Sequence, residues 1–169
     1  SFDYEVLVLE NPSYANLTHR RAVFMVADKF YVILDEAYGS AEGTVNLNFN
    51  ITEGTDAQVV LDLAKGGFHT AFSDGNNLLV RTKSSKAGTF VEKAGFVSYN
   101  IDKSADRQAY QLNVVKTADE PVTRFITILL PSSDPQSETV NVTADAWSAN
   151  GAVVRVTIGE TNYKLTYTL

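Results

Sequence analysis

The sequence predicts an all-β fold, an antiparallel β-sandwich of about 12–14 short strands. Apolar and polar side chains alternate with a period of two along most of the 169 residues, a pattern typical of strands with one buried face. Short breaks rich in Gly, Asn, Asp and Pro separate these runs, and such residues favour turns. Only Asp56–Lys65 has a pattern that would also allow a helical turn or two.

In the first half of the chain, each predicted strand is an alternating run that ends at a turn residue. The ranges are Tyr4–Leu9, Arg21–Ala27, Lys29–Glu36, Gly43–Ile51, Ala57–Leu63, Gly67–Phe72 and Asn77–Thr82. Asn11-Pro12 is expected to end the first strand, and Asp28 to turn a hairpin. Ser73-Asp74-Gly75-Asn76 has strong hairpin-turn chemistry, because Gly and Asn tolerate a positive φ.

Two of these strands have clearly different faces. Phe30, Val32 and Leu34 share one face of their strand. The Gly43–Ile51 strand has an apolar face opposite an amide-rich one. Its apolar residues are Val45, Leu47 and Phe49, and its amide residues are Asn46, Asn48 and Asn50.

The second half continues the same alternation. The predicted strands are Phe96–Ile101, a long strand with Tyr110, Leu112 and Val114 on one face, Thr123–Leu130, Thr139–Ala146, Val153–Ile158 and Tyr163–Leu169. The connections are a turn at 119–121, a loop at 131–135, a turn at 150–151 and a closing turn at 159–162. Tyr163, Leu165, Tyr167 and Leu169 are expected to line one side of the last strand.

Composition narrows the function classes. A length of 169 residues fits one domain, residues 1–169, with a sizeable core. The net charge of −6 and the pI near 4.8 argue against a nucleic-acid partner. There is no cysteine, which excludes disulfides, thiolate metal sites and cysteine nucleophiles. No run of 18 apolar residues occurs, so we expect no membrane-spanning helix.

The two histidines offer few routes to chemistry. Cross-strand pairing in the first hairpin would bring His19 near Asp35, and with His69 these are the right ligand types for zinc or manganese. No His-x-His or His-x-x-x-His spacing fixes two of them on one element. The alternative is structural: His19 bonds to backbone at a strand start, and Asp35 pairs with an arginine. No metal site is therefore assigned, and the three residues remain candidates.

Arg20, Arg21 and Trp147 complete the candidate set, as residues that would face a substrate together with His19. Adjacent residues in a strand point to opposite faces, so Arg20 and Arg21 are not expected to clamp one anion together. One of them would pair with Asp35 or Glu36. Trp147 would either stack on a sugar or cover a core or turn. No nucleophile elbow and no phosphate-binding glycine loop is present, so the residues alone indicate no self-contained active site.

Residues 11–39, NPSYANLTHRRAVFMVADKFYVILDEAYG, resemble the C-terminal β-sandwich region of the heparinase II/III-like polysaccharide lyases. The resemblance is strongest to the heparinase III branch, which cleaves heparan sulfate. It rests on Asn-Pro-x-Tyr, Asn-Leu-x-His-x-Arg and Tyr-x-Val-Ile-x-Asp-x-Ala-x-Gly. It continues through segments 43–47, 72–78, 92–99, 107–110 and 125–131, and so covers nearly the whole chain.

This resemblance implies a bacterial enzyme of the periplasm or the extracellular space, with an α-helical toroid before its β-sandwich. Such enzymes cleave uronic-acid polysaccharides by β-elimination, with a tyrosine and an asparagine from the toroid and a histidine from an early β segment, where some members also bind a divalent metal. The chain has no His-x-His and no His-Asn, so no catalytic residue and no cofactor is assigned to it. By resemblance it is the distal part of such a lyase, and the parent could bind a metal elsewhere.

Three functional hypotheses follow. The chain would be a lyase fragment that is inactive alone, supports the α-toroid and forms a wall of the cleft for an acidic polysaccharide. It would instead be a stand-alone carbohydrate-binding module, using the amide-rich face of Asn46, Asn48 and Asn50 with Trp147 nearby. Or it would be a structural interaction domain with an exposed apolar patch where the toroid docks. The first and third are compatible and are favoured.

Overall fold

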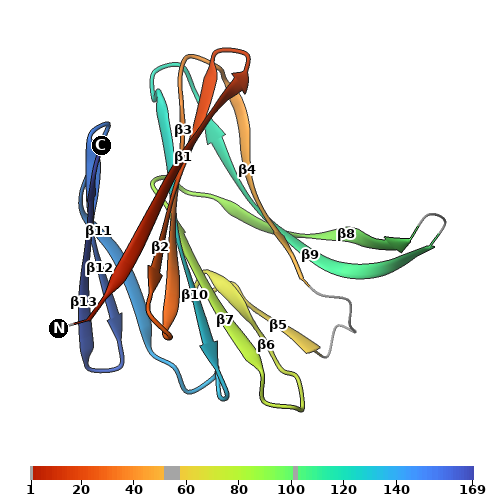
Figure 1. Ribbon diagram of the computed structural model, residues 1–169. Coiled ribbons are helices and arrows are strands. Elements are labelled where there is room, and N and C mark those ends of the chain that lie inside the picture. The colour runs from red at the N-terminus through yellow and green to blue at the C-terminus, as the bar shows by residue number, and fades with distance from the viewer. Residues whose placement is uncertain (1, 52–57, 101–102) are drawn as a thin grey trace.

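The structure, a computed structural model, describes residues 2–51, 58–100 and 103–169 (Figure 1). The strands in these ranges are β1 Tyr4–Tyr14, β2 Leu17–Val26, β3 Phe30–Tyr38, β4 Gly43–Asn50, β5 Val59–Asp62, β6 Gly67–Thr70, β7 Asn77–Ser84, β8 Thr89–Asn100, β9 Lys103–Lys116, β10 Val122–Ser132, β11 Val140–Ser148, β12 Gly151–Ile158 and β13 Thr161–Thr168. The predicted all-β, antiparallel fold is confirmed. No helix among these residues is long and apolar enough to cross a bilayer.

The strands form three antiparallel sheets. The largest has seven strands in the order β1-β2-β3-β10-β7-β6-β5. The other two have three strands each, in the orders β11-β12-β13 and β4-β9-β8. In the large sheet β10 lies between β3 and β7. It therefore joins the group β1–β2–β3 to the group β7–β6–β5.

The two small sheets pack on opposite faces of the large one, as Figure 1 shows with β11–β13 on one side and β4, β9 and β8 on the other. Alternation along β10 explains this arrangement. Ile128 faces the core shared with β11–β13, whereas Phe125 faces the core shared with β4 and β9. In β7, Leu79 likewise faces the core shared with β11–β13, and Val80 faces the opposite side, where it packs with Tyr110 of β9. The molecule therefore has three layers, and the central part of the large sheet, around β10 and β7, is buried on both faces.

The core faces predicted from alternation are correct in most strands. Phe30, Val32 and Leu34 are buried in the core between the large sheet and β11–β13, which we call the first core. Tyr110, Leu112 and Val114 are buried in β9, and Leu47 is buried in β4 while its amide neighbours are exposed. Tyr163, Leu165 and Tyr167 are buried as well, but Leu169 is not: it lies one residue beyond β13 and is 61% exposed.

Several predicted boundaries are wrong. β1 does not end at Asn11-Pro12 but continues to Tyr14, through a register shift after Asn11; as an edge strand it accommodates a proline. β10 includes Pro131 and Ser132, and the closing turn is only Gly159-Glu160. In the described part of 56–65, Gln58 has a 3₁₀ conformation, but β5 follows at once over Val59–Asp62, so this part is mainly strand. Asp56, Ala57 and Ile101 lie outside the described residues.

Candidate functional site

The β2–β3 hairpin carries two arginines that face opposite sides of the large sheet. Its register pairs Arg20 with Glu36 and Arg21 with Asp35. Adjacent residues of a strand alternate in direction, so the hairpin presents one arginine–carboxylate pair to each face. The prediction that the two arginines point to opposite faces is confirmed, and each bonds to a carboxylate of its own face.

On the face toward β4, Asp35 is held by His19 and Arg21. The Asp35 Oδ1 atom lies 2.6 Å from His19 Nε2 and accepts a hydrogen bond of 2.7 Å from Arg21 Nε. A second Arg21 nitrogen donates to Oδ2 at 3.2 Å. Because an ionised carboxylate can only accept, His19 Nε2 is the donor. The predicted proximity of His19 and Asp35 is confirmed, although His19 bonds to this carboxylate rather than to backbone.

A cavity of about 510 Å³ opens beside this cluster, between the hairpin and strand β4. His19, Arg21 and Asp35 line it on one side, and Asn46 and Asn48 on the other. Because Arg21 and Asp35 neutralise one another, the cavity offers polar groups without a strong net charge. Its hydrogen-bonding groups suit hydroxyl-rich ligands better than anions.

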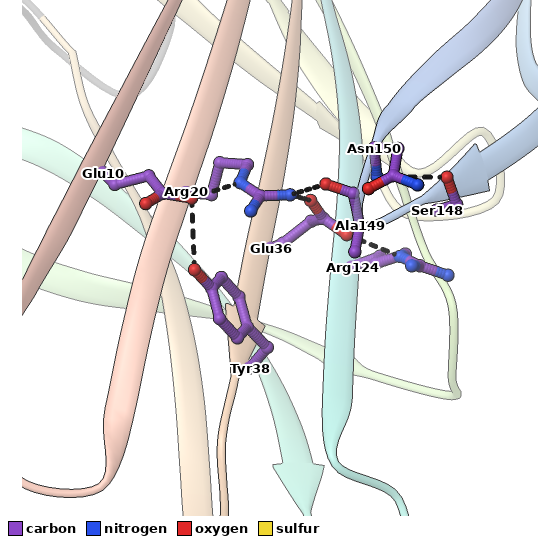
Figure 2. A network of polar contacts seen from close by, with 8 residues as sticks. All are labelled: Glu10, Arg20, Glu36, Tyr38, Arg124, Ser148, Ala149 and Asn150. Carbon is purple, nitrogen blue, oxygen red and sulfur yellow. Dashed lines mark hydrogen bonds and ion pairs between the residues drawn. The ribbon is translucent and has the colours of Figure 1, made fainter. Parts of the chain in front are cut away.

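On the opposite face, Arg20 is the centre of a larger network (Figure 2). Its Nε atom donates to Glu10 at 2.6 Å, and one terminal nitrogen donates to the carbonyl of Ala149 at 2.8 Å and lies 3.4 Å from Glu36. Tyr38 donates to the same Glu10 carboxylate at 3.1 Å. Burial alone lowers the pKa of Arg20, but its bond to Glu10 and the charges of Glu10 and Glu36 raise it overall. The Arg20 and Tyr38 hydrogen bonds lower the pKa of Glu10.

Arg124 of β10 completes this network from the neighbouring strand. Its Nε atom donates to Glu36 at 2.9 Å, so one buried carboxylate serves two arginines. The Arg124 guanidinium also lies 5.2 Å from the centre of the Trp147 ring, a cation–π distance. The sequence did not reveal Arg124, because its pairing with β3 depends on a strand order that no local pattern encodes.

Trp147 lies on β11 and lines a groove of about 470 Å³ between β11 and the pair β7 and β10. It is partly buried and packs against the first core. The expectation that Trp147 lies near the amide-rich face is wrong. Asn46 and Asn48 line the cavity at β4, and β4 and β11 belong to the sheets on opposite sides of the large one.

His69 is separate from the other candidate residues. It lies in β6 and is 6% exposed, and neither ring nitrogen has a hydrogen-bond partner among the described residues. Burial lowers its pKa, Arg81 and Lys65 lower it further, and Asp62 partly opposes them.

The proposed metal set of His19, Asp35 and His69 is not assembled. Within the described residues no group of three or more potential ligands lies together. His19 and Asp35 bond to each other, and Arg21 occupies both carboxylate oxygens. A divalent cation would have to displace a guanidinium there, so these residues do not fit a metal.

Residues 3–154 match the family described as heparinase II/III-like, C-terminal. The chain belongs to that family. This match spans most of the chain and confirms the resemblance seen in the sequence. The Arg20–Glu36 and Arg21–Asp35 pairs and the Trp147 groove are therefore features of a heparinase II/III-like C-terminal region.

Curated proteins and solved structures that are similar to this chain support the same family assignment. A heparin-sulfate lyase of Bacteroides thetaiotaomicron is 45% identical over 98% of this chain, and one of Bacteroides stercoris is 32% identical over 98%. A crystal structure of heparinase III superposes with a TM-score of 0.92 at 41% identity, covering all of this chain. A heparan sulfate lyase structure from Pedobacter heparinus gives 0.87 at 26% identity over 99% of the chain.

The chain spans only about a quarter of these relatives. It covers 24% and 25% of the two curated proteins. It covers 27% and 26% of the two solved chains. Heparinase III-like proteins of this kind therefore contain other domains, and the C-terminal region is one part of a larger molecule.

Proposed function

We propose that this chain is the C-terminal β-sandwich of a bacterial polysaccharide lyase that cleaves heparan sulfate or a related uronic-acid polymer by β-elimination. One observation carries the proposal: nearly the whole chain aligns with heparin-sulfate lyases, yet it accounts for about a quarter of their length. The chain then supports the catalytic domain, an α-toroid, and contributes a wall of the substrate cleft.

The chemistry of β-elimination supports a catalytic site in another part of the parent protein. The reaction needs a group that neutralises the uronate, a base for the C5 proton and an acid for the leaving oxygen. Of the two histidines here, His19 already donates to Asp35, and His69 is buried. The basic groups Arg20 and Arg21 are paired with carboxylates. We therefore assign no catalytic residue to this chain.

An exposed apolar surface supports docking against the rest of the parent. Leu7 and Leu9 of β1 are 57% and 54% exposed, and Met25 and Tyr31 of β2 and β3 are each 41% exposed. The β1–β2–β3 register places them on one face, which we call the outer apolar face. Contiguous exposed apolar residues of this kind mark interaction sites. We propose that the α-toroid covers them.

The substrate also points to a location. An acidic polysaccharide is too large and too charged to cross a membrane unaided, so a lyase that degrades it acts outside the cytoplasm. We therefore propose that the parent protein works in the periplasm or the extracellular space.

The test compares this 169-residue chain with the full-length parent. Each is incubated with heparan sulfate, and the unsaturated uronate product is followed by its ultraviolet absorbance, with alginate as the competing substrate. We expect product from the parent and none from the chain alone. Product formed by the isolated chain would contradict a catalytic site elsewhere, and a parent active only on alginate would contradict the substrate.

A further inference from the structure

The Trp147 groove is formed by the edges of two layers. β11 supplies Thr143, Asp145 and Trp147, whereas β7 and the residues after it supply Lys83, Ser84 and Ser85, with Arg124 from β10. Its floor is apolar, since Ile126 and Val142 are 8% and 1% exposed. An apolar floor below a polar rim, at about 470 Å³, is the form of a small-ligand site.

The rim carries positive charge, although the whole chain is acidic. Lys83 is exposed, its ammonium donates to the neutral Asn141 side chain at 2.6 Å, and it forms no ion pair with a carboxylate of the described residues. Arg124 uses Nε for Glu36, and its two terminal nitrogens have no partner among the described residues. Asp145 is the acidic residue on the rim, and Arg155 already pairs with it at 2.8 Å. Lys83 is thus the rim cation available to an anion, and Arg124, whose charge Glu36 balances, adds N–H donors.

The remaining groups suit a sugar. The Ser85 hydroxyl accepts the backbone N–H of Arg124 at 3.0 Å, so its own O–H stays available to donate. Thr143 adds a second hydroxyl to the lining. The Trp147 indole is partly buried and has the Arg124 guanidinium 5.2 Å from its ring centre, and the part of it that lines the groove offers an aromatic contact to a pyranose. Cations, hydroxyls and an indole together match a sugar that carries a sulfate or a carboxylate.

From this geometry we propose that the groove between β11 and β10 binds an anionic sugar unit, with Lys83 and Arg124 on its sulfate or carboxylate and Trp147 against its ring. The groove would hold one sugar unit of the polymer. This assignment rests on the proposed function only for the identity of the polymer that supplies the sugar.

Trp147 provides a direct measurement, because it is the sole tryptophan in the sequence. A size-defined heparan sulfate oligosaccharide is titrated into the 169-residue chain, and the indole fluorescence is recorded. We expect a saturable change that weakens as salt is added. No saturable change would overturn the proposal, whatever the lyase activity of the parent, so the two proposals fail separately.

Two substitutions test the assigned residues. Lys83→Gln removes an exposed cation whose side chain bonds to Asn141. It should weaken binding about tenfold, which is the effect of one lost charge-assisted hydrogen bond. Lys93→Gln is the matched control, since it removes an exposed lysine from β8 in the opposite layer and should leave binding unchanged. Equal weakening in both would indicate nonspecific attraction and overturn the site.

Two further ligands separate the parts of the proposal. A neutral oligosaccharide of the same length should give no change at the concentration that saturates with the sulfated one. Inorganic sulfate should give none either. A full response to the neutral sugar would overturn the role of the cations, and a full response to sulfate alone would reduce the groove to a simple anion site.

Discussion

At the scale of single residues, the candidate site is organised by two carboxylates that the sheet buries. The side chain of Glu36 is 4% exposed and lies between Arg20 and Arg124, and that of Asp35 is 5% exposed between Arg21 and His19. A buried charge is tolerated only when it is paired and hydrogen-bonded. Each carboxylate therefore helps to fix the positions of two cationic or polar side chains.

Glu36→Gln should destabilise the protein by about 2 kcal/mol, because it leaves two partly buried guanidiniums short of a counter-charge. Urea unfolding followed by far-ultraviolet circular dichroism measures the loss. Glu10→Gln is the control. It removes a carboxylate from the same network, but at an exposed position, so its cost should be clearly smaller. Equal losses in the free energy of unfolding for the two variants would contradict the role given to the burial of Glu36.

His69 should make stability depend on pH. Burial, with Arg81 and Lys65, lowers its pKa in the folded state below the usual 6.5. As pH falls below 6.5, the unfolded chain gains a proton that folded His69 resists, so stability present at neutral pH is lost. His69→Gln should flatten this decline in the free energy of unfolding, measured in urea between neutral and mildly acidic pH. Parallel curves for wild type and variant would contradict the assignment.

Sequence patterns predict some of these residue relations and not others. Strand alternation correctly separates Arg20 from Arg21, and hairpin pairing brings His19 to Asp35. The link from Glu36 to Arg124 spans 88 residues and depends on strand order, which local alternation does not encode. For the same reason Trp147 was wrongly expected beside the amide-rich face. The substrate-facing roles of His19, Arg20 and Arg21 stay predictions.

At the scale of elements, two turn glycines have backbone conformations that other residues adopt only with strain. Gly151 opens β12 with φ of 144°, and a Cβ there would overlap the carbonyl oxygen of Tyr167 on β13. Gly75, in the turn before β7, has φ of 77° but open space where a Cβ would be. The first glycine is required by both conformation and space, and the second by conformation alone.

Gly151→Ala should therefore cost about 3 kcal/mol, and Gly75→Ala about 1 kcal/mol. Thermal unfolding of the two variants, recorded side by side, measures the difference. The larger loss should come with a looser β12–β13 hairpin, visible as faster amide hydrogen exchange in these strands. Equal losses would mean that the sheet shifts to accept the new methyl group.

Strand positions were the most predictable part of the fold, because alternation and turn residues mark each run. Strand ends were less predictable. Asn11-Pro12 has the composition of a stop, yet β1 continues past it, since the free edge of a sheet requires no N–H from a proline. The expectation of one domain over residues 1–169 stays a prediction.

At the scale of the whole molecule, the two small sheets cover different parts of the two faces of the large sheet. The β11–β13 sheet packs along β2, β3, β10 and β7, whereas the sheet of β4 and β9 covers chiefly β10, β7 and β6. Leu7, Leu9, Met25 and Tyr31 of the outer apolar face therefore stay exposed. Sequence alternation indicates which residues share this face, but only the packing of the layers shows that it is left open.

The outer apolar face should make the isolated chain associate weakly with itself. Replacing Leu7 and Leu9 together by Lys should reduce both association and the binding of a hydrophobic dye, because charge blunts an exposed strand edge. Sedimentation velocity over a range of concentrations measures the first effect, and dye fluorescence the second. Val115→Lys, at a residue that is 64% exposed on β9, is the control and should change neither. A comparable effect from Val115→Lys would show that general charge, not this face, controls association.

The insertion of β10 between β3 and β7 also has a consequence for biosynthesis. β3 ends at Tyr38 and β10 begins at Val122, so one edge of β3 has no partner while the intervening chain is made. At about 5–20 residues per second, that delay is on the order of 4–17 s. During that time two incomplete sheets with open edges leave the ribosome. The order of the strands therefore requires that these open edges avoid pairing with other chains until β10 has been made.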